Sequence, residues 1–204
     1  MALISNGSTV FDNGSMASGF GGSMTFIKKL TASASATLSF VDGSDGVVLD
    51  DTYKEYYFTF NNMHPQTTEK DFSFQVDTGT NTNYNQTITS TMFRALHAEA
   101  DNDASLGYTP AYDQAQGTAF QVLSGDVKAD SDSSVSGSLH LFNPSSSTFV
   151  KHFIANTNAM WYEPYSIQTF VAGYVNTTTA LTRVQFKMDS GNIDAGDICL
   201  YGIA

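Results

Sequence analysis

The chain has 204 residues, which suits a single all-β domain, and its 15 Phe and 10 Tyr within a 41% hydrophobic composition exclude global disorder. Charged residues make up only 14%, and 20 acidic against 9 basic residues give a net charge of -11. Lys and Arg supply most of the affinity for nucleic-acid phosphates and for anionic lipids, so we expect no nucleic-acid partner and no membrane partner. No apolar run approaches the ~20 residues of a membrane helix, and no signal peptide is visible. We therefore expect synthesis in a cytoplasm.

Residues 1–23 are rich in glycine and small side chains, with isolated apolar residues among them. This composition predicts an N-terminal arm. We expect a neighbouring subunit to hold it, and a single domain to occupy residues 24–204.

Alternating apolar and polar residues predict strands from residue 24 onward. The clearest alternations cover 72–77 and 184–189, each with one apolar and one polar face. In chain order the predicted strands are 24–30, 36–41, 55–61, 72–77, 87–97, 119–123, 135–142, 148–155, 167–175, 184–189 and 197–203.

The segments between these strands are typical of turns, since Gly and Asn tolerate positive φ and Asp and Ser bond the backbone ahead of them. Examples are residues 42–46 (DGSDG) and 143–146 (NPSS). Antiparallel strands at this spacing predict an all-β fold, an antiparallel β-sandwich of jelly-roll type. A closed barrel is the alternative.

The sequence contains few signs of chemistry. The motifs G-x-S-x-G, H-E-x-x-H and C-x-x-C do not occur. The four histidines are scattered, although His140 and His152 fall on neighbouring predicted strands, and the acidic loops lack EF-hand spacing. We predict no catalytic residue, no cofactor and no metal, and we interpret the single cysteine, Cys199, as a small buried hydrophobe.

Aromatic residues in loop-like stretches are the candidate contact residues. Trp161, Tyr162 and Tyr165 could stack on a glycan or pack against a partner, and Tyr108 and Tyr112 have a similar setting. Packing within the domain or against a partner subunit is the simpler interpretation.

Five stretches resemble a group of largely uncharacterised virion structural proteins of tailed bacteriophages of marine bacteria. They are MALISNG at residue 1, LTASASATLSFVDG from Leu30, NNMHP from Asn61, LFNPSSSTFVKHF from Leu141 and DSGNIDAGDICLYGI from Asp189. The resemblance implies a phage particle protein located in the virion. It supplies no catalytic residues.

The sequence therefore predicts a non-enzymatic structural protein on the exterior of a tailed-phage virion. It would serve in capsid decoration or cement, or as a tail or tail-fibre component. By analogy we expect a homo-oligomer, a homotrimer, that contacts major capsid or tail proteins. The alternatives are a receptor-binding adhesin that recognises host surface glycans and a polysaccharide hydrolase with paired carboxylates among Glu55, Glu69, Glu99 and Glu163.

Overall fold

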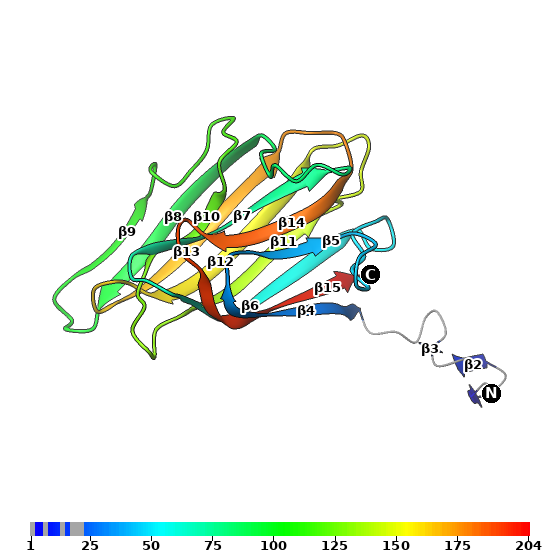
Figure 1. The fold of residues 1–204 in the computed structure, drawn as a ribbon, viewed down its shortest axis with the longest axis horizontal. Helices are drawn as coiled ribbons and strands as arrows, with labels where there is room; N and C mark the ends of the chain where they lie inside the picture. Colours follow the sequence, from blue (N-terminus) through cyan, green and yellow to red (C-terminus); the bar gives the residue numbers. More distant parts are fainter. Residues whose placement is uncertain (1–2, 6–7, 13–14, 17–22) are drawn as a thin grey trace.

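The computed structural model describes residues 3–5, 8–12, 15–16 and 23–204, and within these ranges the chain forms strands and no helix. Two antiparallel sheets pack against each other as a β-sandwich (Figure 1). The large sheet has eight strands, in the spatial order β4 (Met24–Ser35), β15 (Ile193–Ile203), β6 (Glu55–Pro65), β11 (Val135–Phe142), β12 (Lys151–Met160), β13 (Tyr165–Val175), β8 (Ile88–Ala98) and β9 (Ala104–Tyr108). The small sheet has four, in the order β10 (Gln121–Val127), β7 (Lys70–Thr78), β14 (Leu181–Met188) and β5 (Leu38–Val41).

The predicted all-β antiparallel sandwich is thus confirmed, and the two separate sheets exclude the closed barrel. The jelly-roll part of the prediction is not confirmed. A jelly roll divides about eight strands between two sheets, whereas here the sheets have eight and four strands.

The core is a layer of aromatic side chains between the sheets. Phe186 on β14 lies at its centre, with ring centroids 5.3–5.4 Å from those of Phe58 and Phe60 on β6. On its own sheet it packs against Phe72 and Phe74 of β7, at 6.0 and 6.3 Å. Period-two alternation places these rings on the inner faces of both sheets, so their burial joins strands far apart in sequence.

The β7 strand departs from its predicted pattern of one apolar and one polar face. Its polar residues Ser73, Gln75 and Asp77 are as buried as its Phe residues. Gln75 donates to the backbone carbonyls of Gln86, Thr118 and Ala119, and Asp77 accepts from the Tyr84 amide and the Gln86 side chain. Loops cover this face, and β7 holds them because it satisfies their backbone groups.

Lys151, at the start of β12, is fully buried and joins two loops. Its ammonium donates to the carbonyl oxygens of Ser146 and Thr177, at 2.6 and 3.0 Å. Burial lowers the pKa of Lys151, because removal from water disfavours its charged form.

The described parts of residues 1–23 form the short strands β1 (Leu3–Ser5), β2 (Ser8–Asp12) and β3 (Ser15–Met16). Within the described ranges these strands pair only with one another. The rest of the predicted arm, residues 1–2, 6–7, 13–14 and 17–22, lies outside the described residues. At the junction the Ala204 amide donates to the Ser23 carbonyl oxygen, so the described C-terminal residue lies beside the start of β4.

Each predicted strand from residue 24 onward corresponds to an observed one, but β9 was missed. This strand is short, exposed at every residue and at the edge of the large sheet, so no alternation marks it. The final strand also begins at Ile193, four residues before the predicted start. Among the described residues no helix is long and apolar enough to span a membrane.

Truncating Phe186 to Ala should lower the free energy of unfolding by about 3–5 kcal/mol, because it opens a cavity between the sheets. The matched control is Phe149→Ala, since that Phe is 68% exposed in a loop and its loss should change stability by about 0.5 kcal/mol or less. Urea unfolding of both variants measures the difference. Equal losses in the two would contradict this description of the core.

Candidate functional site

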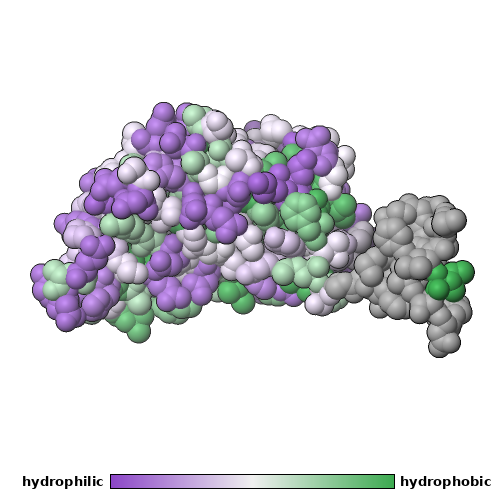
Figure 2. Space-filling view, turned by 90° about the horizontal axis from the view of Figure 1, so that it is seen from below, coloured by the Kyte–Doolittle hydropathy of each residue, from purple (hydrophilic) through white to green (hydrophobic). Residues whose placement is uncertain are grey.

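The exposed hydrophobic side chains gather on the outer face of the large sheet. Six of the eight large hydrophobic residues that are exposed within the described ranges lie on its strands. These six are Met24, Phe26, Phe93, Leu106, Tyr108 and Ile154. In the edge view of Figure 2, hydrophobic residues project along the lower rim, while most of the visible surface is hydrophilic.

The strand register aligns these residues into rows that cross the sheet. One row runs through Phe26, Tyr201, Tyr57, His140, Ile154, Ala172 and Thr91, from β4 to β8. A second, shorter row joins Phe170, Phe93 and Tyr108, from β13 to β9. We call these two rows the outer apolar face. They reach from one edge of the sheet to the other.

Ring geometry shows what this face can contact. Phe93 and Phe170, paired on adjacent strands, stack at 4.8 Å between centroids with 13° between ring planes. Rings that stack across a strand spacing of about 4.8 Å must stand up from the sheet. They therefore present their edges outward. This arrangement suits packing against another apolar surface better than stacking on sugar rings, which needs open ring faces.

Two shallow depressions flank Ile154 on this face. One, of about 490 Å³, is lined by Thr89, Thr91, His152, Ile154, Ala172 and Tyr174 among others. The other, of about 160 Å³, lies between Ile154 and the Phe93–Phe170 pair. A projecting side chain beside depressions gives the surface a shape that a closely packed protein interface can match.

Acidic residues are scarce on the large sheet, whose strands also carry the basic residues Lys28, Lys29, Arg94 and Lys151. Its eight strands, all fully described, contain three of the 20 acidic residues of the chain: Glu55, Asp194 and Asp197. Asp197 pairs with Lys29, at 3.3 Å, and Glu55 contacts His140. The adjacent strands β11, β12, β13, β8 and β9 contain no acidic residue at all among their described positions. The negative charge of the molecule is therefore concentrated away from this face.

The structure brings the predicted contact residues Trp161, Tyr162 and Tyr165 together at the β12–β13 turn. The Trp161 ring lies 4.5 Å from that of Tyr162 and 5.4 Å from that of Tyr165, edge to face in both cases. The Arg94 guanidinium lies 5.4 Å from the Trp161 ring centroid. All three aromatic residues are half-buried. With Arg94 beside its ring and two tyrosines packed around it, Trp161 is mainly a packing residue of this turn.

A polar cluster lies near this turn, at the ends of β7 and β10. The Tyr112 hydroxyl donates to Asp126 at 3.1 Å and to Asp71 at 3.4 Å. Burial raises the pKa of Asp71, and the neighbouring Asp126 and Asp189 charges raise it further. Burial beside the same carboxylates also raises the pKa of Tyr112. The Tyr112 ring covers Gly125, where an added Cβ would lie 2.5 Å from it.

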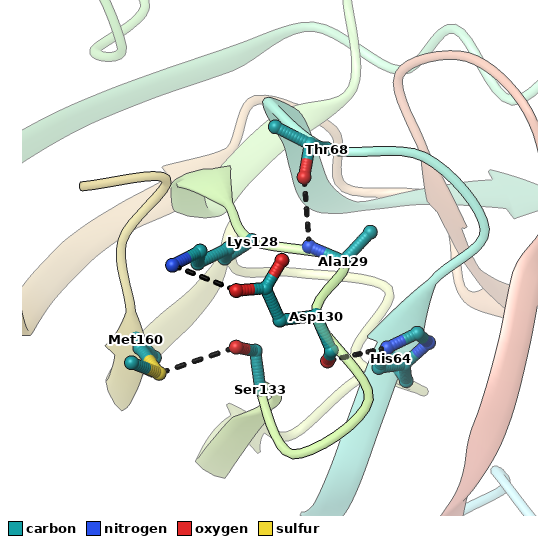
Figure 3. A network of polar contacts seen from close by, with 7 residues as sticks. All are labelled: His64, Thr68, Lys128, Ala129, Asp130, Ser133 and Met160. Atoms are coloured by element: carbon teal, nitrogen blue, oxygen red, sulfur yellow. Dashed lines mark hydrogen bonds and ion pairs between the residues drawn. The ribbon is translucent and has the colours of Figure 1, made fainter. Parts of the chain in front are cut away.

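A polar hollow of about 720 Å³ lies at the opposite end of β11 from Phe142, between β6, β15 and the 128–134 loop. Figure 3 shows the contacts that shape this loop. Lys128 pairs with Asp130 at 2.8 Å, and His64 Nε2 lies 3.1 Å from the Asp130 carbonyl oxygen. The Ala129 amide donates to Thr68 Oγ1 at 3.0 Å. With Asp132 and Asp194 in its lining, the hollow suits neutral hydroxyl groups better than anions.

The remaining sequence candidates take structural roles. The acidic loops act as turns, since Asp42 accepts from the Leu49 amide and Asp50 from the Thr52 amide. Within the described ranges no group of three or more His, Cys, Asp or Glu side chains could hold a metal ion. Cys199 is half-buried on the outer side of β15, beside Tyr201. The prediction of a buried cysteine is therefore wrong. Side chains alternate along β15, so Cys199 points outward while its neighbours Ile198 and Leu200 point into the core.

Comparison of the chain with protein-family models, with curated proteins and with solved structures found no match.

Sequence reasoning missed the outer apolar face, although a signal was present. A sheet with one solvated face shows clean alternation of apolar and polar residues. Here several strands carry apolar residues in both phases, as in Tyr56-Tyr57-Phe58, Met92-Phe93 and Phe153-Ile154. Such doubled patterns indicate a sheet that is covered on both faces.

The substitutions Asp71→Asn and Asp197→Asn should shift stability in opposite directions at pH 7. Folding raises the pKa of Asp71, so the ionised carboxylate lowers the free energy of unfolding at neutral pH. The free energy of unfolding recovers as pH falls and Asp71 becomes protonated, until pH reaches 3.8, the ordinary pKa of the group. Bonds from Thr31 and Lys29 lower the pKa of Asp197, so its contribution is present above 3.8 and is lost below it.

At pH 7 Asp71→Asn should therefore raise the midpoint of urea unfolding, and Asp197→Asn should lower it. Both differences from the parent protein should shrink toward zero below pH 3.8, the ordinary pKa of the two groups. An Asp71→Asn variant that is less stable than the parent at pH 7 would contradict this prediction, because it would show that the charge of Asp71 stabilises the fold.

Proposed function

We propose that this protein is a non-enzymatic structural subunit on the exterior of a tailed-phage virion, either in capsid decoration or cement, or in the tail or its fibres. The observation that carries the proposal is the outer apolar face. It is a surface of exposed rings and aliphatic side chains on an eight-stranded sheet, and such surfaces mark sites of protein association.

The distribution of charge supports a role in assembly. A subunit surrounded by copies and by other virion proteins needs contact surfaces with little charge to desolvate. The large sheet fits that need better than the rest of the chain, with three acidic and four basic residues in eight strands of a chain whose net charge is -11. The acidic loops and sheet ends would then face solvent.

The phage assignment depends on the resemblance of the five sequence stretches. Four of them fall on elements that build the large sheet: LTASASATLSFVDG begins in β4, NNMHP ends β6, LFNPSSSTFVKHF joins β11 to β12, and DSGNIDAGDICLYGI contains all of β15. The stretches that carry the resemblance therefore form the scaffold of the proposed contact surface. The first stretch, MALISNG, includes β1, in the segment predicted to extend toward a neighbouring subunit.

A receptor-binding adhesin that recognises host surface glycans is the second candidate. The observation that favours it is the polar hollow, whose Asn, Ser, Asp and His side chains can bond sugar hydroxyls. The aromatic cluster favours it less, because Trp161 packs against Arg94 and two tyrosines. An adhesin would be found in the tail.

Quantitative mass spectrometry of purified virions of the encoding phage, referenced to the major capsid protein, tests the proposal. Hundreds of copies per particle are the result we expect for a capsid-decorating subunit. A few to a few tens of copies would place the protein in the tail and favour the adhesin. Virions without this protein would overturn the structural role.

A further inference from the structure

We infer that the partner that covers the outer apolar face is a second copy of this chain, docked face to face about a two-fold axis. The inference rests on the proposed function in one respect, that this face serves assembly. It adds the identity of the partner.

Charge favours a second copy at this face over any other part of the surface. Two chains that each carry -11 repel one another wherever acidic loops meet. The strands β11, β12, β13, β8 and β9 form a connected surface without an acidic residue among their described positions. Two acidic side chains contact its margin, and each has a partner in the same chain: Glu55 contacts His140, and Asp113 accepts from the Tyr108 hydroxyl. Two copies can approach here with the least repulsion.

The arrangement of the rows makes the face complementary to itself. Rings lie toward both edges, with Phe26 and Tyr201 on one side and Phe93 and Tyr108 on the other, and Ile154 lies between them. A two-fold axis along the strands places the rings of one edge on those of the other edge. A two-fold axis across the strands that runs along the first row places that row on itself. Either operation brings apolar groups against apolar groups, as an isologous contact requires.

A single face of this kind suits a pair better than the trimer expected by analogy. A closed trimer uses two different patches on each chain, which meet head to tail. The two rows of the outer apolar face lie on one side of one sheet. This face therefore fits a two-fold contact.

The outer side of the large sheet, which carries the two rows, is large enough for a stable pair. Eight strands spaced about 4.8 Å apart, with about ten residues rising about 3.3 Å each, give this whole side an area of roughly 1,000 Å². A standard interface takes about 800 Å² from each partner. Two such sheets pack at about -30°, which is the angle that their twist produces.

Sedimentation of the purified full-length chain at about 1–100 µM tests the inference. We expect a species of twice the 22.0 kDa chain mass. Ile154→Lys puts a charge at the centre of the face, at a side chain 54% exposed in the single chain. It should weaken pairing by about 100-fold or more without unfolding the sandwich, because an unpaired buried charge costs several kcal/mol.

Thr91→Arg is the second variant, since Thr91 lies in the same row as Ile154, with Ala172 between them, and is exposed. It should weaken pairing as Ile154→Lys does. The matched control is Phe149→Lys, which removes an exposed ring in the loop before β12, outside the two rows. The control should sediment as the parent does.

Cys199 gives an independent readout, because it is the one cysteine of the chain and lies half-buried on the outer side of β15. Its reaction with a maleimide reagent should be slower in the parent than in Ile154→Lys at the same high concentration. Equal rates in these two proteins would overturn the inference.

A parent chain that sediments as a monomer or as a trimer would also overturn it, and so would a dimer that Ile154→Lys and Thr91→Arg leave intact. These failures differ from failure of the proposed function. The virion measurement reports whether the protein is in the particle, and sedimentation reports whether two copies pair.

Discussion

The packing of Phe186 between the two sheets is the interaction on which the rest of the structure depends. This ring touches side chains from β6 and β7, and Phe40 of β5 packs against it at 6.2 Å. Side chains alternate between the two faces along a strand. Burial of one alternating set of β6 and β14 residues in this core therefore fixes which residues of these strands point outward. The outer apolar face follows from the same register, since Tyr57 must point outward if Phe58 points inward.

The two sheets use their outer faces differently. On the small sheet, β7 buries Gln75 and Asp77 under loops of the same chain, and these side chains satisfy the loop backbone. On the large sheet Thr89 makes a contact of this kind, accepting from the Gln116 amide, but the outward residues also include Phe93, Phe170 and Ile154. Polar outward residues thus hold loops, while apolar outward residues remain available to another chain. This contrast is the physical basis for treating the large sheet as a contact surface.

The sequence predicted much of this fold because its local signals were strong. Alternation in residues 72–77 and 184–189 identified β7 and β14, and turn residues separated the other strands. It could not predict which strands pair, because pairing such as β15 between β4 and β6 depends on contacts across the whole chain. Nor could it show that Ser73 and Gln75 are buried, since loops distant in sequence cover them. For the candidate site, Trp161, Tyr162 and Tyr165 were grouped correctly because they are close in sequence. The outer apolar face was missed because its residues come from eight strands.

The protein is a β-sandwich in which loops of the same chain contact the outer face of the small sheet, while the outer face of the large sheet exposes hydrophobic side chains. Hydroxyl-radical footprinting of the purified protein, dilute and concentrated, tests that account most directly, because it reports exposure residue by residue. We expect oxidation of Met24, Phe26 and Phe93 to fall as concentration rises and oxidation of Phe149 to stay constant, since all four are exposed in the single chain. Unchanged oxidation of the first three residues across this range would contradict it.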